Sequence, residues 1–165
     1  IYDRLVGSEM CIRDRYPPRC DLTNATYFDS STILSMLLAD AHASKALEHW
    51  ESSNVHLGSK LILFECQVVI HRCQAKMPSE VYSEWNKNAQ QWLGRISESL
   101  ILHEMDDRVL LTAKATPELG ACRTLDAIHL ATALVFRAEG ALLEISSFDN
   151  RFTTAAQSLE LAICS

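Results

Sequence analysis

The segment RTLDAIHLATALVF, residues 123–136, contains the pattern from which the rest of the chain is best understood. Apolar residues recur in it at spacings of three and four, which is typical of a helix with a wide apolar face. Asp126 lies within that face, and the residue one turn later is the apolar Leu130 rather than a lysine or arginine. Because an unpaired buried carboxylate is costly, we expect Asp126 to have a partner elsewhere, either a cationic side chain or a metal ion.

A simpler interpretation of Asp126 is open at this stage. Thr124 can begin the helix, and an aspartate in the first turn interacts favourably with the helix dipole and the free N–H groups. Taken alone, this helix does not separate a first-turn acid from a site residue.

Three other acidic residues occupy similarly apolar surroundings. Asp29 follows the strand-like residues 25–28, Asp149 follows the strand-like residues 142–148, and Glu65 interrupts LILFECQVVI, residues 61–70. Carboxylates that converge repel one another unless a divalent cation lies between them, and hard oxygen ligands suit Mg²⁺ or Mn²⁺. The four acids therefore predict a metal site. A salt bridge between Glu65 and Arg72, which lies on the same predicted helix face, is the main alternative for Glu65.

The order of four motifs resembles the PIN domain family. They are YFDSS at residues 27–31, ILFECQVVIHR at 62–72, RTLDAIHLATAL at 123–134 and SSFDNRF at 146–152. Within that family the chain is most similar to the VapC-type toxins, over about residues 26–163. The segment around Asp126, with SSFDNRF following it, is the most specific part of the resemblance.

The resemblance implies an α/β fold, a PIN-like three-layer α/β/α sandwich with a central, mainly parallel sheet. It also implies an endoribonuclease that depends on Mg²⁺ or Mn²⁺ and leaves a 5′-phosphate on cleaved RNA. The implied catalytic residues and metal ligands, direct or through water, are Asp29, Glu65, Asp126 and Asp149. Ser31 and Ser147 would hydrogen-bond the carboxylates or bound waters, and His129 would be a structural residue rather than a base.

The partners implied by the resemblance are an RNA substrate, a VapB-like antitoxin and a second copy of the chain in a homodimer. The protein would then be the toxin of a type II toxin–antitoxin pair. A housekeeping PIN nuclease in RNA maturation and a non-catalytic PIN-like RNA-binding module are the alternatives. A phosphotransfer domain is disfavoured, because Ser31 stands where such a domain usually carries a second aspartate.

Composition limits these interpretations. The formal net charge of −6 disfavours broad contact with nucleic acid and favours a small, local RNA footprint. It also leaves room for a basic antitoxin segment. The sequence has no apolar run near the roughly 20 residues that span a bilayer and no secretory signal, so we expect a cytoplasmic protein without membrane contact. Six cysteines without a CxxC pair or a zinc-ligand cluster predict free thiols.

The N-terminal residues require separate treatment. LVGSEMCIRDR, residues 5–15, resembles the translation of a sequencing adapter, and the chain starts with Ile1 rather than methionine. We interpret residues 1–20 as an adapter artefact or a disordered lead-in. Residues 21–165 are expected to form a single PIN-like domain, a length sufficient for one hydrophobic core.

Alternating apolar runs predict alternating strands and helices in this domain, hence a parallel sheet flanked by helices. Residues 30–32 are expected to cap the first helix, Gly58 and Ser59 to form a turn, and His42 and His49 to lie on helix surfaces. The expected strands are 25–28, 55–57, 100–103, 142–146 and 161–164, and the expected helices are 33–39, 42–51, 60–74, 80–98, 107–119, 123–138 and 151–158.

Overall fold

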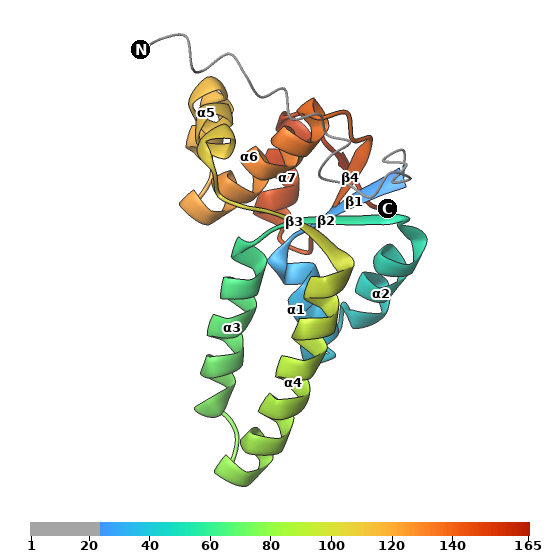
Figure 1. Cartoon of the computed structure of the whole chain (residues 1–165), viewed down its shortest axis with the longest axis vertical. Coiled ribbons are helices and arrows are strands. Elements are labelled where there is room, and N and C mark those ends of the chain that lie inside the picture. Colours follow the sequence, from blue (N-terminus) through green and yellow to red (C-terminus); the bar gives the residue numbers. More distant parts are fainter. Residues whose placement is uncertain (1–23) are drawn as a thin grey trace.

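The computed structural model describes residues 24–165, so the interpretation of residues 1–20 lies outside the described part of the chain. One sheet of five parallel strands, in the order β3-β2-β1-β4-β5, runs through the molecule (Figure 1). The strands are β1 (Ala25–Phe28), β2 (Val55–Ser59), β3 (Leu100–His103), β4 (Leu143–Ser146) and β5 (Ala162–Ile163).

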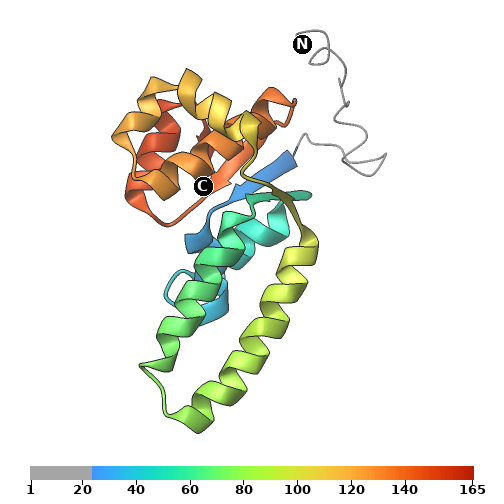
Figure 2. The ribbon, with the colours of Figure 1, turned by 60° about the vertical axis from the view of Figure 1, so that its left-hand side comes forward.

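Helices cover both faces of this sheet, which gives the predicted three-layer sandwich (Figures 1 and 2). On one face lie α1 (Ser30–Leu38), α2 (Ala43–Ser52), α3 (Leu61–Gln74) and α4 (Ser79–Ser99); on the other lie α5 (Asp107–Ala115), the 3₁₀ helix η4 (Pro117–Ala121), α6 (Thr124–Ala138) and α7 (Asn150–Ser158). The long α3 and α4 extend side by side beyond the sheet (Figure 2). None of the helices in residues 24–165 is long and apolar enough to cross a membrane.

The central strand β1 is buried on both faces, and its side chains enter two separate cores. Tyr27 packs with the apolar residues of α6, whereas its neighbour Phe28 packs with those of α1, α3 and α4. Successive strand residues point to opposite faces, so adjacent residues of one motif reach different layers. At Gly58 in β2, a Cβ atom would lie 2.6 Å from Ile62 Cδ1, so a larger residue there would displace the end of the Ile62 side chain.

Two predicted boundaries are wrong. Gly58 and Ser59 belong to β2 rather than to a turn. The single helix predicted over residues 107–119 is divided into α5 and η4, because the residue before a proline is disfavoured in the helical conformation. Thr116, which precedes Pro117, has φ −120° and ψ 83° and ends α5.

Two side-chain placements also differ from expectation. Residues 30–32 lie inside α1, and the side chain of Asp29 caps that helix instead. His49 is only 7% exposed rather than on a helix surface, because Ser146 in β4 lies 2.9 Å from its Nδ1 atom. His42 is exposed, as predicted. A hydrogen-bonding partner on the sheet therefore draws one histidine of α2 into the interior.

Candidate active site

The carboxyl ends of β1 and β4 meet where the order of the strands reverses. β2 and β3 lie on one side of β1, whereas β4 and β5 lie on the other. In parallel α/β sheets, ligands bind outside the carboxyl ends of the strands at such a reversal. Asp29 follows β1 directly and Ser147 follows β4 directly, so two of the predicted site residues emerge at this edge.

Asp29 is held by hydroxyl and backbone donors. Its carboxylate accepts hydrogen bonds from Ser31 Oγ at 2.8 Å, Ser147 Oγ at 3.0 Å and the Ser31 backbone N–H at 3.3 Å. The side chain is 6% exposed. A buried carboxylate with this many donors is fixed in one orientation and needs no cationic side chain to be tolerated.

Ser31 and Ser147 also connect the two loops that follow β1 and β4. Their Oγ atoms lie 3.2 Å apart, and Ser31 Oγ accepts a hydrogen bond from the backbone N–H of Phe148. Ser147 Oγ in turn accepts one from the backbone N–H of Asp149 at 3.2 Å. The two serines thus fix the position of Asp29 and of the backbone that carries Asp149.

Asp149 is half-buried and caps α7. Its Oδ1 atom accepts hydrogen bonds from the backbone N–H groups of Arg151 at 2.8 Å and Phe152 at 3.4 Å. Such N-cap contacts stabilise a helix by about 1 kcal/mol. Asp149 therefore has a structural function that any role in binding a ligand must accommodate.

Asp126 lies in the first turn of α6 and is half-buried. It is therefore both a first-turn acid and an acid within an apolar face, the two interpretations left open by the sequence. Burial raises the pKa of its carboxyl group above the usual value of 3.8, and the charges of Asp149 and then Asp29 raise it further. Arg123 and His129 oppose the shift without cancelling it. Asp126 thus faces two other carboxylates with too little positive charge nearby, a condition that a divalent cation would relieve.

Glu65 lies on α3 and contacts a histidine of α6, the helix that carries Asp126. Within residues 24–165, the side chain found against the Glu65 carboxylate is His129, whose Nε2 atom lies 2.8 Å from Glu65 Oε2, and no salt bridge to Arg72 is formed. Arg72 is exposed. The alternative of a Glu65–Arg72 salt bridge is therefore wrong.

The cysteines near the site are not suited to nucleophilic chemistry. Cys66, Cys73, Cys122 and Cys164 are free, which confirms the prediction for the described thiols. Burial, together with the charges of Glu65 and Asp29, raises the pKa of the Cys66 thiol to about 12. Because the thiolate is the reactive form, this group stays inert at neutral pH.

The donor set fits a hard divalent cation in its chemistry. The four predicted carboxylates and two hydroxyls supply only oxygen atoms, and the charges of Asp149 and Asp29 both act against ionised Asp126. Within residues 24–165, no three acidic, histidine or cysteine side chains are grouped closely enough to hold an ion as they stand. Mg²⁺ usually retains several waters and is bound through one or two carboxylates, so this arrangement is compatible with it.

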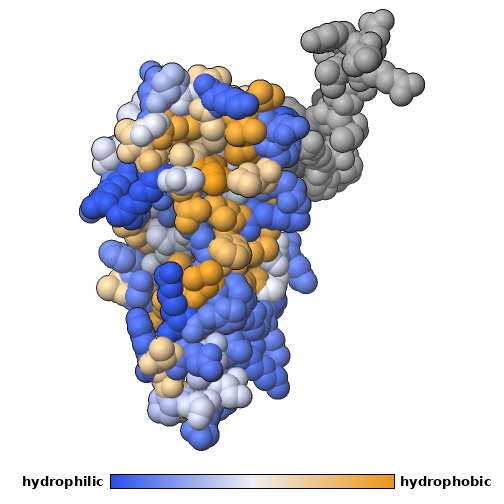
Figure 3. All heavy atoms as spheres, turned by 90° about the vertical axis from the view of Figure 1, so that its left-hand side faces the viewer, coloured by the Kyte–Doolittle hydropathy of each residue, from blue (hydrophilic) through white to orange (hydrophobic). Residues whose placement is uncertain are grey.

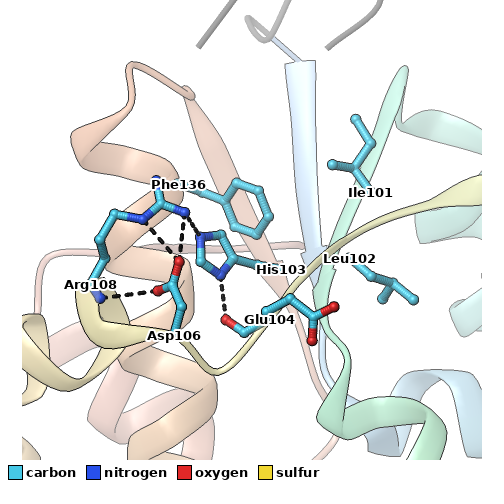
Figure 4. Close-up of a pocket in the computed structure, with 7 residues that line it drawn as sticks. All are labelled: Ile101, Leu102, His103, Glu104, Asp106, Arg108 and Phe136. Carbon is cyan, nitrogen blue, oxygen red and sulfur yellow. Dashed lines mark hydrogen bonds and ion pairs between the residues drawn. The ribbon is translucent and has the colours of Figure 1, made fainter. Parts of the chain in front are cut away.

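A cavity of about 380 Å³ lies at the end of β3, apart from these acids (Figure 4). Its polar lining residues bind one another: Arg108 contacts both Asp106 and His103, and His103 Nδ1 lies 2.6 Å from the backbone oxygen of Glu104. None of the four predicted site acids lines it. The predicted site acids therefore lie outside this cavity.

Residues 26–157 match the family model of the PIN domain. The chain belongs to the PIN domain family. Over 60 residues it is 43% identical to Ribonuclease VapC35 of Mycobacterium tuberculosis, in strains CDC 1551 / Oshkosh and ATCC 25618 / H37Rv. That match covers 36% of this chain and 44% of the relative, so the chain matches less than half the length of these curated relatives.

Among solved structures, a toxin–antitoxin complex from Klebsiella pneumoniae has a similar fold, with a TM-score of 0.53. The similarity covers 76% of this chain and 88% of that chain at 17% sequence identity. At this identity the comparison concerns the fold alone, and it agrees with the sandwich described above for this PIN domain.

The sequence did not reveal two contacts of this site. The sequence pattern places Tyr27 in a strand and gives it no polar partner, yet its hydroxyl lies 2.9 Å from His129 Nδ1. His49 Nδ1 lies 2.9 Å from Ser146 Oγ at the end of β4. The available signal was a polar atom in a buried segment: a tyrosine or histidine among apolar residues must find a hydrogen-bonding partner. That rule predicts that a partner exists but does not identify it.

Proposed function

We propose that this PIN domain protein is a VapC-type ribonuclease that hydrolyses RNA phosphodiester bonds with Mg²⁺ or Mn²⁺. One observation carries the proposal: in a chain of this family, the half-buried Asp126 faces Asp29 and Asp149 at the strand-order reversal, without enough positive charge to balance them. An acidic cluster of this kind favours a divalent cation over a purely structural role.

Each residue of the site has a proposed part in the reaction. Asp29, Asp126, Asp149 and Glu65 would hold the ion, directly or through water, and present it to the scissile phosphate. The ion supplies an activated water and neutralises charge on the phosphate oxygens. Ser31 and Ser147 keep the Asp29 carboxylate in place through their hydrogen bonds, so it does not have to be ordered when substrate arrives.

The proposed partners follow from charge and from exposed apolar surface. The net charge of −6 favours a basic guest such as a VapB-like antitoxin segment, and we propose a cytoplasmic toxin that is blocked in this way. Figure 3 shows a band of exposed hydrophobic side chains on the side where α3 and α5 lie. Large apolar residues exposed on these elements and on the loop and helix beside α5 include Phe64, Met105, Leu110, Leu111 and Leu125. Antitoxin binding and homodimer formation would both cover surface of this type.

The proposal is tested by RNA cleavage with the purified full chain. Single-stranded RNA of mixed sequence is incubated with the protein and Mg²⁺, Mn²⁺ or EDTA, for wild type, Asp126→Asn and the control Asp107→Asn. Asp107 lies in the first turn of α5, as Asp126 lies in the first turn of α6, but Asp107 is exposed whereas Asp126 is half-buried. We expect metal-dependent cleavage that falls at least about 100-fold in Asp126→Asn and is unchanged in Asp107→Asn. Equal cleavage by wild type and Asp126→Asn would refute the assignment of this residue.

A further inference from the structure

A buried series of hydrogen bonds connects Tyr27 to Glu65 through His129. Tyr27 Oη lies 2.9 Å from His129 Nδ1, and His129 Nε2 lies 2.8 Å from Glu65 Oε2. Tyr27 is 0% exposed and His129 is 1% exposed, so water is excluded from the bond between them, whereas Glu65 is half-buried. Both nitrogens of the imidazole are therefore occupied by protein partners.

The three residues come from three elements and from both layers of helices. Tyr27 is on the central strand β1 and, like Leu130 of α6, belongs to the core on the α6 face. Glu65 is on α3, and its neighbour Cys66 belongs to the core on the opposite face. The contact between His129 and Glu65 thus brings an acid from one helical layer to the start of the helix that carries Asp126.

The geometry fixes the imidazole from both sides. A carboxylate only accepts hydrogen bonds, so His129 Nε2 donates to Glu65 Oε2, while the Tyr27 hydroxyl holds Nδ1 on the other side of the ring. The orientation of the ring is thus set by a residue of β1 and a residue of α3.

We propose that His129, held at its other ring nitrogen by the Tyr27 hydroxyl, is a positioning residue that orients the Glu65 carboxylate toward the cation site. The inference rests on the proposed function, since it assumes that Glu65 serves a metal ion. The ring holds Oε2, so Oε1 would be the oxygen that binds the ion. Such outer partners orient the residues that bind a metal, and their loss typically weakens metal affinity about 10- to 100-fold.

A purely structural histidine would behave differently. Its removal would lower the stability of the fold through the buried contacts it makes, without a specific effect on an ion bound beyond Glu65. The two roles are therefore separated by metal affinity measured at a temperature where every variant is folded.

The experiment is isothermal titration of Mn²⁺ into the metal-free full chain and into matched variants. His129→Leu fills the buried space but removes the donor to Glu65, whereas His129→Gln retains an amide N–H. Tyr27→Phe removes only the hydroxyl. His103→Leu is the control, because His103 is also a buried histidine but is bound to Arg108 and lies outside the site.

We expect His129→Leu to weaken Mn²⁺ binding about tenfold, and His129→Gln to restore it to within about threefold of wild type. Tyr27→Phe should weaken binding by a smaller factor, and His103→Leu should not change it. In a Glu65→Gln background, His129→Leu should cause no further loss, because its effect passes through Glu65.

Two outcomes would count against these proposals, and they differ. Unchanged Mn²⁺ affinity in folded His129→Leu, with wild type binding normally, overturns the positioning role and leaves the proposed function intact. A wild type that binds no Mn²⁺ refutes the metal-dependent function and the positioning role together. If His129→Leu weakens Mn²⁺ binding as much in the Glu65→Gln background as it does in wild type, His129 acts on another residue. That result would also overturn the inference.

Discussion

Two groups of acidic side chains in this molecule can be compared. They differ in whether a basic side chain nearby neutralises their charge. Near the start of α5, Arg108 lies between Asp106 and Glu139 and forms an ion pair with each (Figure 4 shows the first). At the β1–β4 edge, Asp126 faces Asp29 and Asp149 without a comparable cation. The first group contains its own counter-charge, and the second does not.

The pKa values follow this difference. Burial by itself would raise the pKa of Asp106, but hydrogen bonds from Arg108 and the Val109 N–H, with the charges of His103 and Arg108, outweigh it and lower the pKa. For Asp126, burial and the neighbouring carboxylates act in the same direction and raise it. An acidic cluster thus indicates a binding site only when the protein does not supply the counter-charge itself.

The largest change in stability is expected from removing the cation of the balanced group. Arg108→Met keeps most of the side-chain length but takes the positive charge away from Asp106 and Glu139. Because the three side chains are partly exposed, we expect a loss of only about 1.5 kcal/mol in the free energy of unfolding. Denaturant unfolding measures it, with Lys60→Met as the control for the exposed Lys60–Glu104 pair. Equal losses in both variants would show that Arg108 has no special role.

A smaller effect with a defined pH dependence is expected for Asp106→Asn. Asparagine still caps a helix, so the change removes mainly the charge, at a cost of about 1 kcal/mol at pH 7. The folded-state pKa of Asp106 lies below the unfolded value of 3.8, so its stabilisation is present above pH 3.8 and is lost as the pH falls through the folded value. Unfolding curves of wild type and variant should therefore converge at acidic pH. A difference that persists undiminished at low pH contradicts the charge-based explanation.

The smallest effect should have the opposite sign. In the metal-free protein, ionised Asp126 destabilises the fold at neutral pH because its folded-state pKa is raised. Asp126→Asn should therefore increase the free energy of unfolding, by about 0.5 kcal/mol, when EDTA is present. Thermal unfolding in EDTA at pH 7 measures this, and a variant clearly less stable than wild type would show that Asp126 is already well compensated.

The fold was predictable because each strand and helix has its own apolar pattern in the sequence, bounded by polar residues. All five strands and the helices around them were expected near their observed positions, since burial on both faces of a parallel sheet leaves a readable run such as residues 25–28. The errors have local causes. Thr116 before Pro117 breaks one predicted helix, and Gly58 continues a strand because β2 pairs with β3 there, opposite Leu102.

The site was less predictable, because it depends on contacts between distant elements. Spacing along α3 suggested Arg72 as a partner for Glu65, but the partner is His129, 64 residues away on α6. Likewise, the capping of α1 by Asp29 and of α7 by Asp149 depends on backbone geometry after each strand. The roles of the four acids in binding metal stay predictions, drawn from the motifs and supported by the charge balance around Asp126.

The most direct test of that charge balance is the melting temperature of wild type and Asp126→Asn in EDTA and in excess Mg²⁺. At about 100 times the dissociation constant, binding adds about 2.7 kcal/mol, which corresponds to a rise of about 5–10 °C for a domain of this size. We predict this rise for wild type and less than half of it for Asp126→Asn. A melting temperature of wild type that Mg²⁺ leaves unchanged, or an equal rise in both proteins, would contradict the account.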